Sequence, residues 1–268
     1  LLLKCCYFVP VSSNFITKIK LIYSIIFLII GFLLGWFIAK SIIQATPMQT
    51  STEEKKQVNE ILKIGFVGPL TGDNANLGQP ITDGIQLAVE DINNLGGING
   101  KKLTAVLEDG KCNGKDGATA GQKLLQQDKV IAIVGGTCSS ETLAIAPMAN
   151  ENKVVLVSPS STNPAITTAG DYVFRVVGSD ALQGKVMAEY VFNKGMKKAA
   201  VIYANSDYNL GLKNVFSDTF TSLDGEVVAA ETYEQDSKDF KTQLTKIKAA
   251  NPDAIYIVPY SEGGLIAK

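Results

Sequence analysis

The sequence predicts an α/β protein with two lobes, each built on a parallel β-sheet, and a membrane-spanning helix ahead of them. Three observations predict this architecture. A long uncharged apolar run occupies 21–39, and from 62 onward short apolar strands alternate with amphipathic helices. Such alternation forms right-handed βαβ units and therefore parallel sheets. The alternation is interrupted near 171–180, where we expect the chain to cross between the lobes.

The apolar run near the N-terminus has the length and charge pattern of a membrane anchor. Every residue from 21 to 39 is uncharged, and about 20 apolar residues suffice for a helix to cross a bilayer. Lys18 and Lys20 precede the run and Lys40 follows it, which favours an exported remainder. A cleavable signal peptide is the alternative, but its apolar region is usually only ~7–15 residues long. In addition, 43–45 (IQA) matches its cleavage site poorly.

The chain is expected to divide into five consecutive parts. The segment 44–61 is polar, contains a proline and lacks apolar periodicity, so we interpret it as a flexible linker. The parts are an N-terminal tail (1–18), a transmembrane anchor or signal sequence (19–43), the linker (44–61), lobe 1 (62–178) and lobe 2 (179–268). Because the sequence stops inside a predicted helix, lobe 2 is expected to be incomplete.

The predicted strands and helices follow from apolar periodicity and from the glycine and proline residues that bound it. Strands are expected at 62–67, 102–107, 130–134, 154–157, 198–203, 226–230 and 254–258. Helices are expected at 81–95, 118–127, 141–150, 181–193, 210–223 and 240–249, with a last one starting at 262. The segment 171–178 is expected to be irregular.

The composition argues against several classes of function. Formal net charge is −1, from 25 basic and 26 acidic residues, so no field of one sign favours nucleic acid. The absence of histidine removes the usual general base and most zinc sites. The four cysteines form no C-x-x-C pair, and no P-loop or G-x-G-x-x-G loop follows a strand. We therefore expect a binding protein with no metal and no cofactor.

Polar loops after the predicted strands of lobe 1 are the expected ligand site, because open α/β sheets bind ligands at the carboxyl ends of their strands. The segment 135–142 (GGTCSSET) combines glycines and hydroxyls with a helix start, which suits a carboxylate. A plain N-cap is the alternative reading of that segment alone. The segment 158–164 (SPSSTNP) is a polar turn that two prolines make rigid.

Two loops of lobe 2 complete the expected site. The segment 205–208 (NSDY) contributes a tyrosine, and 259–262 (PYSE) contributes a second tyrosine and the carboxylate of Glu262. The loops of both lobes together suit a zwitterion, with its carboxylate on the helix N-terminus and its ammonium on Glu262, since buried charges need such partners.

Several ordered segments resemble the branched-chain amino-acid-binding proteins of ABC transporters. They include LKIGFVGPLTGDNANLGQ, GIQLAVEDINNLGGINGKKL, VSPSSTNP, YVFRVVGSD and IYANSDYNLGL, and the resemblance is collinear from about 62 to the chain end. It implies the type I periplasmic binding fold, with two Rossmann-like lobes. It also implies a solute-binding component of an ABC uptake system, not an enzyme. Its lobes would close by hinge on a small amino acid and present it to a membrane permease.

The resemblance assigns roles to residues of lobe 1. It implies that Ser139 and Thr162 bind the ligand carboxylate, and that Thr162 and the backbone of Ser160 also lie near the ammonium. It further implies a disulfide between Cys112 and Cys138 beside the binding cleft. Such a bridge agrees with an exported, oxidising location.

The resemblance also assigns roles to Tyr208, Glu262 and Leu77. Tyr208 is expected to close over the ligand from lobe 2, and Glu262 to take the ammonium. Leu77 falls where family members often carry a large aromatic residue, which leaves the side-chain preference of the site open. The predicted location is the cell membrane, with an anchored, extracytoplasmic binding domain. The alternative function is a sensor or receptor domain of the same fold that binds amino acids or amides.

Overall fold

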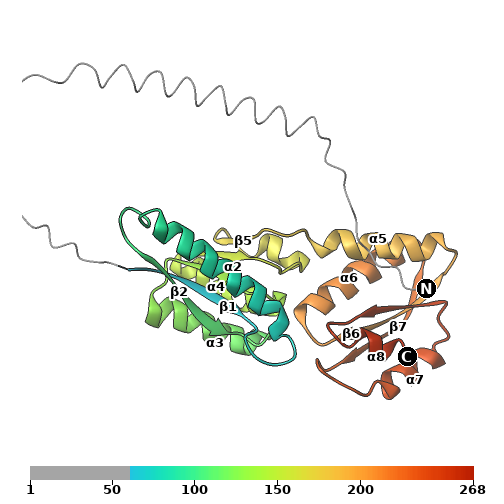
Figure 1. Ribbon diagram of the computed structural model, residues 1–268. Helices are drawn as coiled ribbons and strands as arrows, with labels where there is room; N and C mark the ends of the chain where they lie inside the picture. Colours follow the sequence, from blue (N-terminus) through green and yellow to red (C-terminus); the bar gives the residue numbers. More distant parts are fainter. Residues whose placement is uncertain (1–60) are drawn as a thin grey trace, which may run out of the picture. The chain divides into compact units, whose positions relative to one another are not determined.

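A computed structural model describes residues 61–268 of the chain. The predicted tail, the predicted anchor and nearly all of the predicted linker lie outside the described residues. Within the described part, no helix has the length and apolar character needed to cross a membrane. This part contains two parallel sheets, each accompanied by helices (Figure 1).

The first sheet has five parallel strands in the order β2-β1-β3-β4-β5. Its strands are β1 Leu62–Gly68, β2 Leu103–Asp109, β3 Ala132–Gly135, β4 Val155–Ser158 and β5 Val173–Arg175. Because β2 joins one side of β1 and β3 joins the other, the strand order reverses at β1. Such a switch point leaves a crevice beyond the carboxyl ends of the two diverging strands, here β1 and β3.

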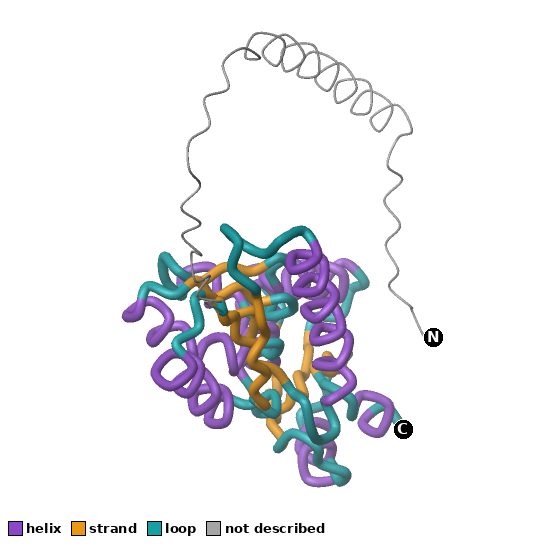
Figure 2. Tube along the Cα trace, turned by 60° about the vertical axis from the view of Figure 1, so that its left-hand side comes forward, coloured by secondary structure: helices purple, strands orange, loops and turns teal. Residues whose placement is uncertain are grey.

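Helices connect these strands and flank the sheet (Figure 2). They are α2 Ala75–Asn94, α3 Gly114–Lys123 with a π-helical turn at Leu124–Asp128, α4 Ser139–Asn152, and a 3-10 helix at Pro164–Thr168. Apolar side chains of the π-helical turn, β3, α4 and β4 form the core of this part, with Leu124, Ile133, Ile145 and Leu156 fully buried. This packing fixes α4, whose N-terminus follows β3.

Helix α2 begins at Ala75, six residues before the predicted start, and it contains Pro80. The glycine- and proline-rich segment after β1 predicts a loop, because proline removes a helical hydrogen bond. Tertiary packing explains the difference. A Cβ on Gly78 would lie 2.0 Å from the carbonyl oxygen of Pro69, so only glycine lets the first turn of α2 approach this loop.

The segment 171–178, which was expected to be irregular, contains strand β5. This strand pairs in parallel with β4, in a register that runs from Leu156↔Val173 to Ser158↔Arg175. Three residues are too few to display the alternation that identifies a strand in a sequence. The strand is identified by its hydrogen-bonded pairing with β4, which is a tertiary contact.

The second sheet has three parallel strands in the order β7-β6-β8. Its strands are β6 Lys198–Ala204, β7 Glu226–Tyr233 and β8 Ala254–Val258. The accompanying helices are α5 Asp180–Asn193, α6 Asp207–Ser222, α7 Lys241–Ala249 and α8 Gly263–Ile266. The strand order again reverses at the first strand, so a second crevice lies beyond the carboxyl ends of β6 and β8.

Strand β6 is buried on both faces, as expected for the middle of a sheet that helices cover on two sides. Ala199 and Val201 belong to a core with Phe216 and Phe220 of α6. The alternate residues Ala200, Ile202 and Ala204 belong to a second core, which Phe240 and Ile247 complete. The two-residue period of a strand sends successive side chains to opposite faces, so one apolar run serves both cores.

Candidate ligand-binding site

A cavity of about 500 Å³ lies at the carboxyl ends of strands from both sheets. Its lining comes from the segments that follow β1, β3, β4, β6 and β8, including the N-terminal turns of α2, α4 and α6, and from the start of α5. The lining residues are Asp73, Asn74, Asn76, Leu77, Ile81, Thr137, Cys138, Ser139, Ser160, Thr162, Asp180, Gln183, Tyr208, Pro259, Tyr260 and Ser261. Both switch points of the fold therefore contribute to one cavity.

The N-terminus of α4 presents Ser139 to this cavity. Ser139 is the first residue of the helix and is only 2 % exposed. Its hydroxyl oxygen accepts the backbone N–H of Asn163 at 3.3 Å. The Ser139 hydroxyl proton is therefore free to be donated toward the cavity, where the positive end of the helix dipole also favours an anion.

Unlike the Ser139 hydroxyl, the hydroxyls of Ser160 and Thr162 donate their protons to acceptors within the protein. The Ser160 hydroxyl donates to the carbonyl oxygen of Thr137 at 2.6 Å, and the Thr162 hydroxyl donates to the carboxylate of Asp180 at 2.6 Å. The backbone N–H of Asp180 returns a bond of 2.9 Å to the Thr162 carbonyl. Ser139, Ser160, Thr162 and Asp180 are called the polar wall of the cavity.

Asp180 is a cavity residue that the sequence reasoning missed. It is the first residue of α5 and only 3 % exposed. Burial raises the pKa of its carboxyl, while the Thr162 hydrogen bond and the Arg175 guanidinium act in the opposite direction. An acidic residue at a helix start is an ordinary helix signal, so the sequence pattern alone does not mark Asp180 as part of a site.

Two tyrosine rings, Tyr208 and Tyr260, face the same cavity together with Pro259. These three residues are called the aromatic wall. The Tyr208 and Tyr260 rings lie 5.3 Å apart between centroids and are tilted by 44°. Burial raises the pKa of Tyr208 to about 12, and the Asp180 carboxylate adds to the rise. Tyr260 was expected as the second tyrosine of the site, and the structure brings it to the cavity beside Tyr208.

Glu262 does not line the cavity, in contrast to the expectation that it meets a ligand ammonium. It is 1 % exposed, and its carboxylate accepts the backbone N–H of Asp236 at 2.8 Å and of Tyr260 at 3.1 Å. Tyr233 donates its hydroxyl to the same carboxylate at 3.4 Å. The physical reason for the difference is that backbone donors take up this carboxylate, one from its own loop at Tyr260 and one from the loop after β7 at Asp236.

Leu77 lies on the first turn of α2, lines the cavity and remains 41 % exposed. The structure thus brings Leu77, Ser139, Ser160, Thr162 and Tyr208 to one cavity. Their predicted contacts with a ligand stay predictions.

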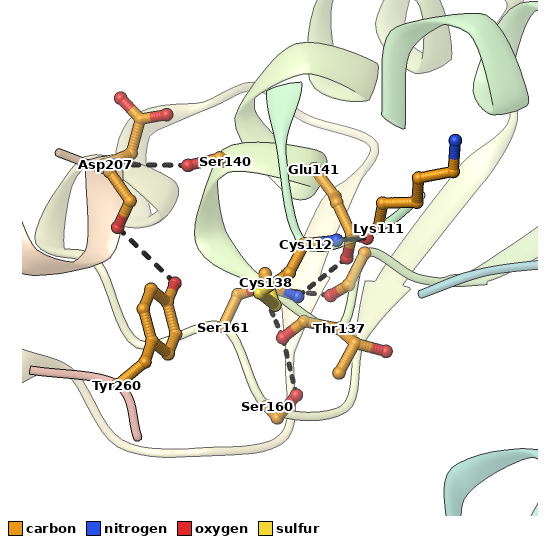
Figure 3. Close-up of a disulfide and its surroundings, with 12 residues drawn as sticks. Lys111, Cys112, Thr137, Cys138, Ser140, Glu141, Ser160, Ser161, Asp207 and Tyr260 are labelled. Atoms are coloured by element: carbon orange, nitrogen blue, oxygen red, sulfur yellow. Dashed lines mark hydrogen bonds between the residues drawn. A yellow bond between two sulfur atoms is a disulfide. The ribbon is translucent and has the colours of Figure 1, made fainter. Parts of the chain in front are cut away.

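The two sets of loops touch beside this cavity, at the first turns of α4 and α6. The backbone N–H of Asp207 donates to the Ser140 hydroxyl at 3.1 Å, as Figure 3 shows. The Asn163 side chain donates to the Asp207 carbonyl. An ion pair of 3.6 Å between Lys238 and Asp73, both exposed, adds to this contact. A hinge motion can break or remake these interactions.

The predicted disulfide between Cys112 and Cys138 is present, with 5.2 Å between the Cα atoms (Figure 3). Beside it lies Glu141, which is completely buried. Its carboxylate accepts the backbone N–H of Cys112 at 2.9 Å and that of Cys138 at 2.8 Å. Burial raises the pKa of Glu141 to about 7, although these hydrogen bonds oppose the rise. Glu141 and the disulfide therefore join the loop after β2 to the N-terminus of α4.

No metal site is evident in the described part of the chain, where no three Cys, Asp or Glu residues gather in a way that could hold an ion.

The fold and the shared cavity define a two-lobed ligand-binding protein. A family model described as periplasmic binding protein matches residues 61–264. The chain belongs to this family of solute-binding proteins, which are not enzymes and which work outside the cytoplasm.

The curated relatives and solved structures agree with this assignment. An amino acid binding protein of Pseudomonas aeruginosa is 37% identical over 195 residues, which cover 72% of this chain and 52% of that protein. The branched-chain amino acid transporter substrate-binding protein LivJ of Streptococcus pneumoniae, solved with isoleucine, has a TM-score of 0.64 and 37% identity. That match covers 77% of this chain and 60% of LivJ.

A third neighbour differs in its ligand. A solute-binding protein of an ABC transporter from Rhodopseudomonas palustris, solved with 3,4-dihydroxybenzoic acid, has a TM-score of 0.64 and 27% identity over 76% of this chain and 56% of that chain. These comparisons confirm the type I periplasmic binding fold and the resemblance to branched-chain amino-acid-binding proteins. The chain spans about half the length of the curated relatives it matches.

Proposed function

We propose that this chain is the extracytoplasmic solute-binding component of an ABC uptake system and binds a small amino acid, branched-chain or similar. The observation that carries the proposal is the cavity of about 500 Å³, whose lining joins a helix N-terminus and hydroxyls to two tyrosines. Such a combination of an apolar surface with a few placed polar groups is typical of small-molecule sites. The amino-acid-binding relatives support the same ligand class.

The proposed mechanism is hinge closure of lobe 1 (62–178) and lobe 2 (179–268) on the ligand. The polar wall binds the ligand carboxylate and ammonium, and the aromatic wall covers its side chain, with Leu77 on the remaining side. The contacts between the lobes support this motion, because the hydrogen bonds of Asp207 and the exposed Asp73–Lys238 ion pair can be exchanged on opening. The closed form is then recognised by a membrane permease.

Binding is tested by isothermal titration calorimetry of the purified protein with leucine, isoleucine, valine and 4-hydroxybenzoate. Saturable binding of one of the amino acids is expected, together with a ligand-dependent rise in the unfolding temperature. Preferential binding of 4-hydroxybenzoate would instead place the chain with the aromatic-acid binders. Absence of heat and of thermal shift with all amino acids and amides would refute the proposal.

We further propose that the segment 19–43 anchors the binding domain in the membrane. The support is its uncharged apolar stretch of about 20 residues between flanking lysines. Fractionation of cells that express the chain tests this. The protein should remain with the membranes after a high-salt wash and leave them only in detergent. Recovery in the soluble fraction, with a shortened N-terminus, would indicate a cleaved signal peptide.

A further inference from the structure

The polar wall of the cavity contains two hydroxyls whose protons are already committed to protein acceptors. A hydroxyl has one proton to donate and two lone pairs to offer. Ser160 donates its proton to the Thr137 carbonyl at 2.6 Å, and Thr162 donates its proton to Asp180 at 2.6 Å. An ionised carboxylate can only accept, so it fixes the direction of the Thr162 hydrogen bond. Toward the cavity, both hydroxyls can therefore act only as acceptors.

Ser139 is the contrasting member of this wall. Its oxygen accepts the backbone N–H of Asn163 at 3.3 Å, which leaves its proton for the cavity. It also stands at the N-terminus of α4, where backbone N–H groups favour an anion. The polar wall is thus divided into a donor side, at Ser139, and an acceptor side, at Ser160 and Thr162. A zwitterion has the matching division, whereas a simple carboxylic acid needs only the donor side.

The charge of Asp180 reinforces the acceptor side. Asp180 is 3 % exposed and lines the cavity, and among the described residues no lysine or arginine forms an ion pair with it. The neighbouring Arg175 donates instead to the carbonyls of Thr162 at 3.1 Å and Asn163 at 2.8 Å. A buried carboxylate without an ion pair is costly, and a cation on the cavity side would offset that cost.

From these contacts we propose that Asp180 is a positioning residue that makes the Thr162 hydroxyl an acceptor and thereby selects ligands with an ammonium group over plain carboxylic acids. The inference rests on the proposed amino-acid-binding function and specifies how the ammonium acceptor at Thr162 is held in place. It also distinguishes this chain's expected ligand from the aromatic acid bound by the R. palustris neighbour.

The test compares each amino acid with its counterpart lacking the amino group, using leucine with 4-methylpentanoate and isoleucine with 3-methylpentanoate. Titration calorimetry gives the affinity ratio within each pair for the wild-type protein and for Asp180→Asn, Asp180→Glu and Asp218→Asn. Asp218 lies exposed on α6, so its variant makes the same charge change away from the cavity. Thermal unfolding of every variant shows whether it is folded.

Asp180→Asn is expected to weaken amino-acid binding by about 10-fold or more, as for loss of a hydrogen bond with a charged group. Binding of the acid without the amino group should change by less than about threefold, so the ratio within each pair collapses. Asp180→Glu should restore part of the ratio, and Asp218→Asn should leave it unchanged. A purely structural role of Asp180 would instead weaken both members of a pair equally, and that result would overturn the inference.

A second pair of variants keeps the test decisive if Asp180→Asn does not fold. Thr162→Ser retains the hydroxyl and should retain the ratio, whereas Thr162→Val removes the acceptor and should lower it about 10-fold. Equal ratios in these two variants would overturn the inference while the binding function stands. Wild-type protein that prefers the acids without an amino group would overturn both.

Discussion

The two walls of the cavity differ in chemistry, but a buried glutamate supports each of them. The polar wall offers hydroxyls, a helix N-terminus and a carboxylate, whereas the aromatic wall offers the tyrosine rings Tyr208 and Tyr260. Behind each wall, a buried glutamate accepts backbone N–H groups from two segments. Glu141 joins Cys112 to Cys138, and Glu262 joins Asp236 to Tyr260. The polar wall thus recognises charged groups and the aromatic wall covers apolar surface. A buried carboxylate holds the loops of each wall in place.

The disulfide is expected to give the largest effect, because it restrains the polar wall through the N-terminus of α4. The bridge closes a loop with a sequence separation of 26, for which the chain-entropy relation gives a stabilisation of about 3.5 kcal/mol. We expect replacement of both Cys112 and Cys138 by serine to lower the free energy of unfolding by about 2–4 kcal/mol. Urea denaturation measures the change.

Reduction of the wild-type protein with dithiothreitol provides the control for the disulfide. It should reproduce the loss, and it should have no effect on the double variant. A loss below about 0.5 kcal/mol would mean that hydrogen bonds to Glu141 hold the polar wall without the bridge.

The pH dependence of stability tests Glu141, the support of the polar wall. Burial raises its pKa from 4.5 to about 7, so the folded protein holds this proton more tightly than the unfolded chain does. The stabilisation from this group is therefore complete below about pH 4.5 and is lost as pH rises to about 7. The shift corresponds to about 3 kcal/mol, at 1.36 kcal/mol per pKa unit.

The measurement is urea denaturation of Glu141→Gln across this pH range. The free energy of unfolding of this variant should not decline as the pH rises. Its stability should also be lower at acid pH, since an amide cannot accept at both oxygen positions. Glu151→Gln, at an exposed position of the same helix, should keep the wild-type pH dependence. An unchanged slope in Glu141→Gln would show that another group titrates.

The corresponding support of the aromatic wall is tested by Glu262→Gln. One of the backbone N–H groups of Asp236 and Tyr260 would lose its acceptor, so we expect a loss of about 2 kcal/mol in the free energy of unfolding. The affinity ratio of leucine to 4-methylpentanoate should stay at the wild-type value. A collapse of that ratio would show that Glu262, and not only the Asp180–Thr162 pair, selects for the ammonium group.

The smallest expected effect belongs to the aromatic wall itself. Tyr208→Ala should weaken amino-acid binding by about 1–2 kcal/mol, because it removes the ring that packs against Tyr260 and covers the cavity. Tyr208→Phe keeps the ring and should remain within about 0.5 kcal/mol of the wild type. Calorimetry with leucine measures both. Equal losses in the two variants would indicate that the Tyr208 hydroxyl, not its ring, carries the interaction.

Much of the fold could be predicted from the sequence, since long apolar periods identify elements. Strand β8 has the predicted bounds 254–258, and β6 differs from its prediction by one residue. Strand β5 and the first turn of α2 could not be predicted, because the pairing with β4 and the approach of Gly78 to Pro69 are tertiary contacts.

The candidate site could likewise be predicted only in part. The helix N-terminus at Ser139 and the polar turn around Thr162 carry local signals of glycines, prolines and hydroxyls, and both lie on the cavity. Asp180 carries no such signal. Glu262 was expected at the cavity for its charge, but backbone donors of two loops, at Asp236 and Tyr260, take up its carboxylate.

The sequence by itself determined the α/β class, the family resemblance and the loops that reach the cavity, because strand and helix periods and ordered motifs are local properties. Only the tertiary structure decided which carboxylate faces the cavity and which hydroxyls can donate there. Thr162 and Asp180 are 18 residues apart and share a hydrogen bond, which the pairing of β5 with β4 makes possible. The direction of that bond depends on an acceptor that no local pattern specifies.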